Sequence, residues 1–413
     1  MDKKIYNRNL YRFNTGSIGA PEHGTGLLLA AVTHRVNKAE GGWASAIAEP
    51  SPHPVPDHHI DFSCPYTQSQ PGKNPLPPRV VGLEYKDCDL SWVYLSAFDN
   101  HNCVAAFSML NHGIIVVHVD DGPTEETVEQ LVVAGAYQLP LTLFINTSGY
   151  GDVDSESIES MQVEIAELCQ KFGSTIDKIF HGDLQRAARC ICGTCEGCLT
   201  VIQLLDHLNA LATHLPALII EQLAQPCLLN VLYPFRINEQ PAVQVYVRSG
   251  CFDRREMLYV VGGGSGKIGC VGMEMLYRKT DALRPGDIAT LLIDGPVAIW
   301  VGSGTDLTSH RLYQAVPKYF AAQVYLLPHS DGGRSQPLYY SSTPVIMTGM
   351  KQFSCTLEPT EGNKKEKNIP LGEKVHLFIH PDKSAKLPSF QSRQKIFLRL
   401  GRKIIGTGQI TAL

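Results

Sequence analysis

The sequence predicts an α/β domain with a mostly parallel sheet, followed by two small antiparallel β-barrels. In the first half, continuous apolar runs alternate with segments of helical periodicity, which is typical of parallel strands covered on both faces. After about residue 225, short segments alternate apolar with polar residues between turns. Their total length fits two barrels better than one. The predicted domains span 1–215, 216–315 and 316–413.

The first half opens with a strand at Tyr11–Ile18, a glycine-bearing turn at Gly19–Gly26 and a helix at Leu27–Val36. The segment Gly41–Pro78 is rich in Pro, His, Ser and Gly, so we expect an irregular excursion there. The elements expected next are strands within Val80–Leu95, a buried strand at Gly113–Val119, a helix at Glu125–Gly135, a buried strand at Leu139–Ile145, and helices at Ser155–Phe172 and Leu199–Leu211.

The second half is predicted to consist of strands separated by tight turns. Turns are expected at Pro285–Asp287, Asp331–Gly333 and Gly401–Arg402, because Gly, Pro and Asp favour them. The predicted strands are Val243–Val247, Leu258–Val261, Ile288–Ile293, Ala321–Leu327, Val375–Ile379 and Ile396–Leu400.

Composition and charge narrow the class of protein. The chain has 413 residues, of which 44% are hydrophobic, and its longest apolar runs are far shorter than the roughly 20 residues that cross a bilayer. Met1–Phe13 carries an acid and no apolar core, so no presequence is visible. The net charge of −4 conceals a basic end, since Lys351–Leu413 has 12 Lys and Arg against 5 Asp and Glu. That end is either a nucleic-acid surface or a solvated charged face.

The twelve cysteines indicate a reducing compartment, because a chain of this length buries a core without disulfides and most of its cysteines are isolated. Four of them are close together: Cys190, Cys192, Cys195 and Cys198. Four thiols suffice for a tetrahedral zinc site, yet so compact a cluster strains to close around one ion. Zinc binding and free thiols on a loop both remain open, and no metal ligand is assigned.

The turn after the first predicted strand has the spacing of a phosphate-binding loop. Gly19 and Gly24 are placed, as such a loop requires, between a strand and a helix. The lysine of that loop is replaced by Thr25, and the hydroxyl residue that holds magnesium is replaced by Gly26. The alternative is an ordinary turn.

Longer stretches resemble elongation factor Tu, the factor that delivers aminoacyl-tRNA. Its GTPase domain is similar to Thr15–Val36 (TGSIGAPEHGTGLLLAAVTHRV), Gly113–Thr127 (GIIVVHVDDGPTEET) and Leu139–Tyr150. Its two β-barrels are similar to Val271–Lys279, Leu283–Leu292, Gln323–Leu338 and Phe397–Thr411. The resemblance implies that the first domain is a P-loop GTPase-like domain, that GTP and magnesium are cofactors, and that tRNA, the ribosome and a nucleotide exchange factor are partners.

The chain departs from this family where the family performs its chemistry. The Asp-Cys-Pro-Gly-His stretch that positions the attacking water falls at about Val93–Ala97, and neither its aspartate nor its histidine is present. Only Asn146 remains of the guanine-recognising element. We therefore assign no catalytic residue and expect at most a residual GTP site formed by Gly19, Gly24, Thr25, Gly26 and Asn146. The candidates for a compensating cation are His23, Lys38 and Lys73.

On the tRNA side, the resemblance implies three binding residues. Glu274 matches the glutamate that contacts the terminal adenosine, and Arg334 matches an arginine that approaches the tRNA backbone. Arg399 lies in the closing hairpin. A surface strand residue is the alternative for Glu274. DNA and membranes are not expected as partners.

The function that we predict is that of an elongation factor Tu-like protein of translation, binding aminoacyl-tRNA or ribosome-associated partners, with GTP binding and hydrolysis weak or lost. The alternatives are a scaffold protein that kept the fold, and a working GTPase with compensated residues. The third domain resembles the mitochondrial branch, so the expected location is mitochondrial or cytoplasmic.

Overall fold

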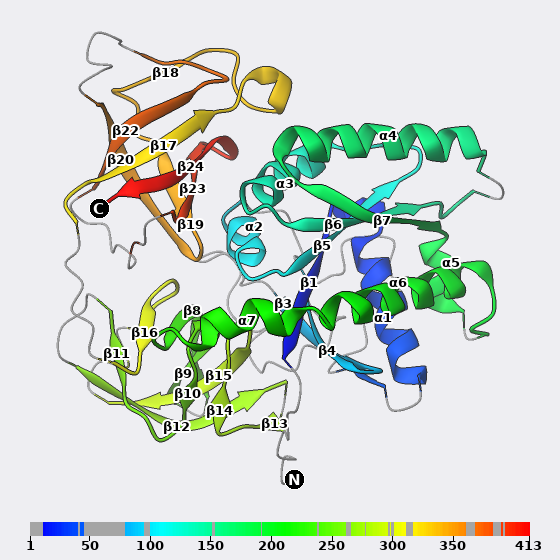
Figure 1. The fold of residues 1–413 in the computed structure, drawn as a ribbon, viewed down its shortest axis with the longest axis horizontal. Coiled ribbons are helices and arrows are strands. Elements are labelled where there is room, and N and C mark those ends of the chain that lie inside the picture. The colour runs from blue at the N-terminus through cyan, green and yellow to red at the C-terminus, as the bar shows by residue number, and fades with distance from the viewer. Residues whose placement is uncertain are drawn as a thin grey trace.

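The computed structural model describes residues 11–39, 42–44, 79–94, 100–150, 153–190, 192–237, 239–261, 266–276, 278–295, 298, 301–310, 317–360, 368–382, 390 and 393–413. Most of the predicted excursion at Gly41–Pro78 lies outside these residues, as do Lys73 and 95–97. The described elements form three bodies: a sheet covered by helices and two barrels (Figure 1).

The first body has a seven-stranded sheet in the order β2-β3-β4-β1-β5-β6-β7. Its strands are β1 (Arg12–Ile18), β2 (Trp43–Ala44), β3 (Arg79–Tyr85), β4 (Cys88–Tyr94), β5 (His112–His118), β6 (Pro140–Asn146) and β7 (Thr175–Gly182). The strands β4, β1, β5, β6 and β7 pair in parallel, while β3 pairs antiparallel with β2 and β4. The predicted mostly parallel sheet is confirmed.

Helices cover both faces of this sheet (Figure 1). They are α1 (Thr25–Lys38), α2 (Asn100–Phe107), α3 (Glu125–Ala136), α4 (Ser155–Phe172), α5 (Leu184–Arg189) and α6 (Glu196–Ala212), and α7 (Leu215–Leu223) follows α6 toward the first barrel. One buried core contains side chains of α1, α5 and α6, and a second contains those of α2, α3 and α4. No described helix combines the length and the apolar character needed to span a membrane.

Helix α4 shows how the local sequence sets the limits of an element. The Asp154 carboxylate accepts a hydrogen bond from the Ser157 amide and caps the first turn. The helix ends at Gly173, whose φ of 89° is left-handed and favours glycine. Met161 and Ile165, four residues apart on one face of the helix, are buried.

The first barrel is closed by strands in the order β11-β16-β8-β9-β15-β12, because β11 also pairs with β12. Its strands are β8 (Leu228–Ile237), β9 (Gln240–Ser249), β11 (Leu258–Val260), β12 (Lys267–Met275), β15 (Ile288–Asp294) and β16 (Asp306–Thr308), with β13 (Arg278–Lys279) added to β12 and a small pair of β10 (Phe252–Asp253) and β14 (Ala282–Leu283).

The second barrel is closed in the order β17-β22-β20-β19-β23-β24. Its strands are β17 (Phe320–Leu326), β19 (Val345–Thr348), β20 (Lys351–Pro359), β22 (Lys374–Pro381), β23 (Lys395–Leu400) and β24 (Lys403–Ala412), with a small pair of β18 (Leu338–Tyr339) and β21 (Asn368–Ile369). The prediction of two antiparallel barrels after an α/β domain is therefore confirmed.

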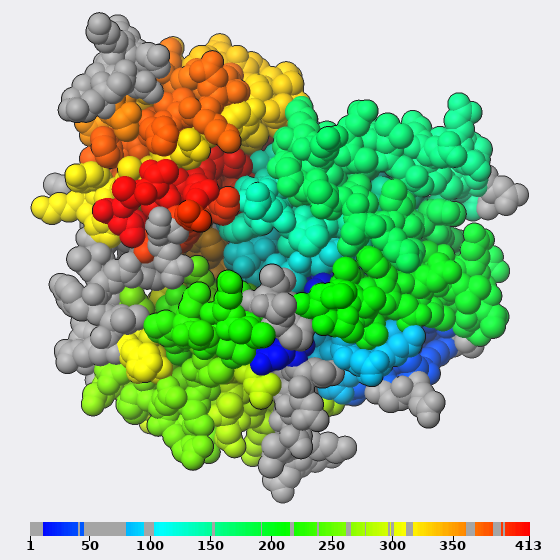
Figure 2. Space-filling model, in the orientation of Figure 1, coloured from blue at the N-terminus to red at the C-terminus, as the bar shows by residue number. Residues whose placement is uncertain are grey.

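The second barrel packs on α2 and α3 of the first body. Phe397 is fully buried in a core that it shares with side chains of these helices, and its ring centroid lies 5.5 Å from that of Tyr137. The Ile404 amide donates a hydrogen bond to the Glu129 carboxylate at 2.6 Å. Figure 2 shows the C-terminal strands, in red, directly against the cyan atoms of the first body.

The first barrel contacts β1 and the β2–β3 edge of the first body through polar side chains. The side-chain amide of Asn14, buried in β1, donates to the Gly286 carbonyl at 2.9 Å. The Arg278 guanidinium forms an ion pair with Glu84 at 2.5 Å and lies over the Trp43 ring. Both barrels are thus anchored on the first body by contacts within the protein itself.

Candidate functional site

The β1–α1 loop, Gly19–Gly26, leaves the carboxyl end of β1, the edge at which parallel α/β sheets bind ligands. It contains one short 3-10 helix, η1 (Pro21–His23). Gly19 and Gly24 have φ values of 129° and 100°, which only glycine adopts without strain. The predicted loop is therefore present, between the predicted strand and the predicted helix.

The amides of Gly19, His23 and Gly24 are occupied by hydrogen bonds within the protein. Gln130, from α3, accepts from the Gly19 amide at 2.7 Å and donates to the Gly19 carbonyl at 3.4 Å. The His23 amide donates to the Ala20 carbonyl at 3.0 Å, and the Gly24 amide donates to the Pro21 carbonyl at 3.2 Å. Proline has no amide hydrogen. An anion held by these three amides would have to replace these bonds.

His23, a candidate for a compensating cation, is fully buried. Its nearest acid is Asp121, whose carboxylate lies 3.8 Å from Nε2. Burial lowers the pKa of His23 more than the attraction of Asp121 raises it, so the ring is neutral at pH 7. His23 therefore supplies no positive charge to the loop.

Lys38, the second candidate, lies at the far end of α1. It is separated from Thr25 by thirteen residues of helix, which at about 1.5 Å per residue is roughly 20 Å. A lysine side chain does not span that distance. The third candidate, Lys73, lies outside the described residues.

The entrance to the loop is acidic. Glu22 is exposed at the tip of the loop, and Glu126 lies at the start of the neighbouring helix α3. Burial, and then the negative charge of Glu22, raise the pKa of Glu126. With Asp121, whose carboxylate lies 3.8 Å from His23, three carboxylates lie on or beside this loop. The negative charge of these carboxylates would repel an anionic ligand.

Asn146 ends β6 and connects three segments. Its side-chain nitrogen donates to the His23 carbonyl at 3.0 Å, and its oxygen accepts from the Ser148 and Leu184 amides at 3.1 and 3.3 Å. The nearby carboxylate of Asp183 caps α5 by accepting from the Arg186 amide. Asn146 thus holds the loop in place, and its side-chain oxygen and nitrogen are already engaged.

Glu274 lies on β12 of the first barrel, half-buried, and pairs across the sheet with Lys279 and Thr290. The two arginines lie on the second barrel. Arg334 follows the 3-10 helix η3 (His329–Asp331), and its Nε donates to the Gln336 carbonyl at 3.2 Å. Arg399, on β23, donates to the Gln352 side chain at 3.0 Å. All three residues are partly exposed, and they are divided between the two barrels.

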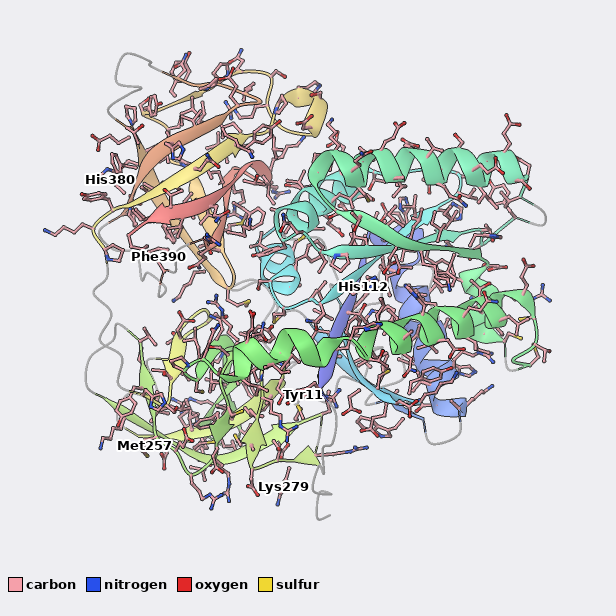
Figure 3. All side chains as sticks on the ribbon, viewed as in Figure 1. Tyr11, His112, Met257, Lys279, His380 and Phe390 are labelled. Carbon is pink, nitrogen blue, oxygen red and sulfur yellow. The ribbon has the colours of Figure 1, made fainter. Side chains whose placement is uncertain are left out.

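Two polar features were missed by sequence reasoning. The first is a cluster near the start of β5, β6 and β7, inside the first body (Figure 3). There Asp177 receives hydrogen bonds from His112 at 3.0 Å and from Thr142 at 2.8 Å, and His207 of α6 lies 3.4 Å away. Burial raises the pKa of Asp177, but the hydrogen bonds from these partners outweigh it and hold the pKa well below its usual range.

The second is a cavity of about 140 Å³ where the three bodies meet. Its lining includes Tyr137, the residue after α3, Arg248 and Asp306 of the first barrel, and Lys351 and Lys395 of the second. No sequence signal marks either feature, because the residues are far apart along the chain and only the fold brings them together.

No protein-family model matches the sequence. The structure is similar to the apo form of translation elongation factor SelB from Methanococcus maripaludis, with a TM-score of 0.68 at 14% identity over 98% of this chain and 80% of SelB. The complex of the same SelB with the GTP analogue GppNHp gives a TM-score of 0.70 at 14% identity over the same shares. At this identity the likeness is one of fold, and the chain has the three-body fold of a translation elongation factor.

Proposed function

We propose that this chain is an elongation-factor-like protein of translation that binds aminoacyl-tRNA or a ribosome-associated partner, while its GTP binding and hydrolysis are weak or lost. The proposed role in translation is supported by the fold that the chain shares with SelB over 98% of its length. SelB itself is described with a bound GTP analogue, whereas the corresponding loop of this chain lacks the charge that such a ligand requires.

The proposal that nucleotide binding and hydrolysis are weak or lost rests on the state of the β1–α1 loop. Its Gly19 amide is bonded to Gln130, its His23 is neutral, and its entrance is acidic. Phosphoryl transfer depends on positioned positive charge, a metal ion and an oriented water. We infer that the residues of this loop do not fit a nucleoside triphosphate with magnesium.

The size of the effect follows from the contacts involved. A charge-assisted contact to phosphate contributes about 1.5–3 kcal/mol, so the loss of two or more implies about three orders of magnitude in affinity. The acidic entrance adds repulsion in the same direction.

RNA binding is proposed for the barrels. Arg334 and Arg399 are partly exposed on the second barrel, within or beside the basic C-terminal part of the chain. Contacts from arginine to phosphate position RNA without recognising its sequence. Glu274 would then approach the aminoacyl end from the first barrel.

The test combines two measurements on the full chain. Isothermal titration with Mg·GTP and Mg·GDP measures nucleotide binding, and filter binding with aminoacylated and deacylated tRNA measures RNA binding. We expect no heat from either nucleotide at micromolar concentrations, and salt-sensitive tRNA binding that Arg334→Ala with Arg399→Ala weakens. Arg255→Ala is the matched control, because Arg255 is an exposed arginine of the first barrel that forms an ion pair with its neighbour Asp253.

Each outcome separates the alternatives. Binding of tRNA without nucleotide supports the proposal. Binding of neither ligand would favour a scaffold that kept the fold. Tight nucleotide binding with turnover would show a working GTPase and would overturn the inference drawn from the loop.

A further inference from the structure

A loop with four cysteines joins α5 to α6, and the proposed function does not use it. Cys190 follows the last residue of α5, Cys195 caps the start of α6, and Cys198 lies in the first turn of α6. Cys192 lies between the two helices. Gly193 has a φ of 74°, a left-handed conformation that reverses the chain between the two pairs of cysteines.

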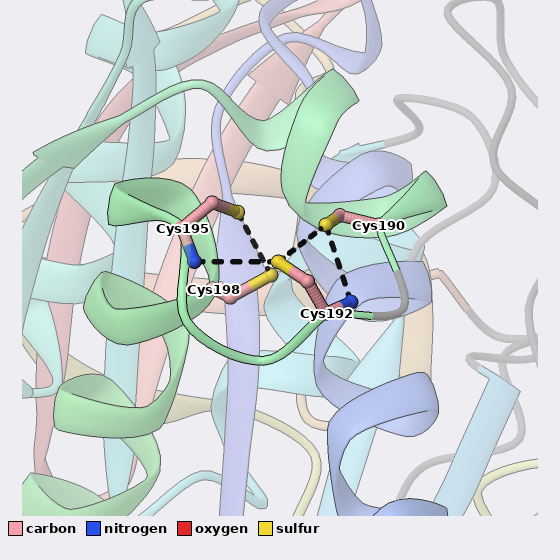
Figure 4. A group of neighbouring side chains, drawn as sticks. All are labelled: Cys190, Cys192, Cys195 and Cys198. Carbon is pink, nitrogen blue, oxygen red and sulfur yellow. Dashed lines mark hydrogen bonds between the residues drawn. The ribbon is translucent and has the colours of Figure 1, made fainter.

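The four sulfur atoms converge on one point (Figure 4). All of them lie within 4.8 Å of one another. The sulfurs of Cys190 and Cys192 are 2.9 Å apart, and those of Cys195 and Cys198 are 3.1 Å apart. A zinc ion bound tetrahedrally at about 2.3 Å separates its sulfur ligands by about 3.8 Å, a value within this range. An iron–sulfur cluster places several irons between its thiolates and needs a wider spacing.

The backbone is arranged to stabilise negative sulfur. The Cys192 amide donates to the Cys190 sulfur at 3.4 Å, and the Cys195 amide donates to the Cys192 sulfur at 3.3 Å. Hydrogen bonds of this kind from the second shell orient metal ligands. Cys195 and Cys198 also lie at the start of α6, where the helix dipole favours negative charge.

A buried cation lies beside the cluster. Arg35 of α1 is 6% exposed, and its guanidinium donates to the Cys190 carbonyl. No carboxylate among the described residues forms an ion pair with the Arg35 guanidinium. Burying a charge without a counter-charge is costly. Four thiolates around one Zn²⁺ carry a net charge of −2, which would supply that counter-charge.

We propose that Cys190, Cys192, Cys195 and Cys198 bind one zinc ion. Four sulfur ligands leave no open position, so the site is structural: it joins the end of α5 to the start of α6 and holds both against Arg35 of α1. The close spacing in the sequence is no obstacle, because the reversal at Gly193 and the ends of two helices bring the sulfurs together.

Zinc content tests the proposal. The full chain is expressed in medium that contains zinc and is dialysed against a weak chelator. Its zinc content is then measured by elemental mass spectrometry. We expect one zinc per chain in the unaltered protein and a decrease of about tenfold or more in Cys192→Ser. Cys192 is exposed, so its replacement leaves the core intact, which circular dichroism checks. Cys251→Ser replaces another exposed cysteine outside the cluster and is expected to keep the zinc.

Cobalt substitution provides an independent measurement. A Co²⁺ ion in a tetrahedral thiolate site gives strong visible absorption together with thiolate-to-metal charge transfer, and both should appear in the unaltered protein and in Cys251→Ser but weaken in Cys192→Ser. A protein without zinc whose four thiols are all free, a disulfide between Cys195 and Cys198, or bound iron in place of zinc would each overturn the assignment.

Discussion

Restoring the missing residues of the phosphate loop is the most demanding test of the reasoning about nucleotide binding. Thr25→Lys with Gly26→Thr supplies the cation and the hydroxyl that the loop lacks. One charge-assisted contact from the new lysine would contribute about 1.5–3 kcal/mol, equivalent to about 10–150-fold in affinity.

The structure opposes this gain. A phosphate held by the His23 and Gly24 amides would require them to leave the Ala20 and Pro21 carbonyls. At about 0.5–1.5 kcal/mol for each bond, this costs about 1–3 kcal/mol. The midpoints of the two ranges differ by less than about 1 kcal/mol, so we expect the double variant to bind GTP within about tenfold of the unaltered protein.

The assay is isothermal titration with Mg·GTP, accompanied by circular dichroism and a melting curve. Thr25 is buried, so a lysine there could impair folding. Glu22→Lys is the companion variant, since it places a cation at the entrance from an exposed position. Micromolar GTP binding by either folded variant would refute the view that several parts of the loop oppose nucleotide together.

Three further predictions concern stability and reactivity. Phe397→Ala should destabilise the protein by about 3–5 kcal/mol and loosen the second barrel from α2 and α3, as measured by thermal unfolding and small-angle scattering. The control is Phe390→Ala, in the core of the second barrel, which should lower the melting temperature without changing the scattering. Because the pKa of Asp177 is lower in the folded protein than its unfolded value of about 4, its carboxylate stabilises the fold above about pH 4, and this stabilisation is lost as the pH falls further. In Asp177→Asn the melting temperature should therefore fall less steeply between about pH 5 and 2 than in the unaltered protein. The same pH dependence in both proteins would contradict this. In metal-free protein, hydrogen bonds from Cys190 and from the Thr194 and Cys195 amides lower the pKa of Cys192 to about 5. At pH 6.5 an alkylating reagent should therefore modify Cys192 faster than the exposed Cys251, as followed by mass spectrometry of the peptides. Equal alkylation rates for the two cysteines would contradict this prediction.

Much of the fold could be predicted because local chemistry marks it. The limits of α4 were predicted correctly, since Asp154 and Gly173 mark its two ends. The buried strand predicted at Leu139–Ile145 is β6, shifted by one residue. In contrast, β7 was not predicted, because its exposed residues interrupt the apolar pattern and it lies at the edge of the sheet.

The sequence indicated where the candidate nucleotide site lies and which residues it lacks, but not which side chains surround it. The absence of a lysine at Thr25 is visible in the sequence itself. That His23 is neutral, that Gln130 occupies the Gly19 amide and that Glu126 borders the entrance follow only from the fold.

The sequence by itself determined the order of the domains, the loop between the first strand and helix, and the residues that this loop lacks, because periodicity, turn chemistry and residue type are local properties. Only the tertiary structure decided which side chains meet: the packing of Phe397 on α3, the network around Asp177, and the convergence of four sulfurs beside Arg35. Such contacts depend on how distant segments pack, and burial then sets the charge of the groups that packing encloses.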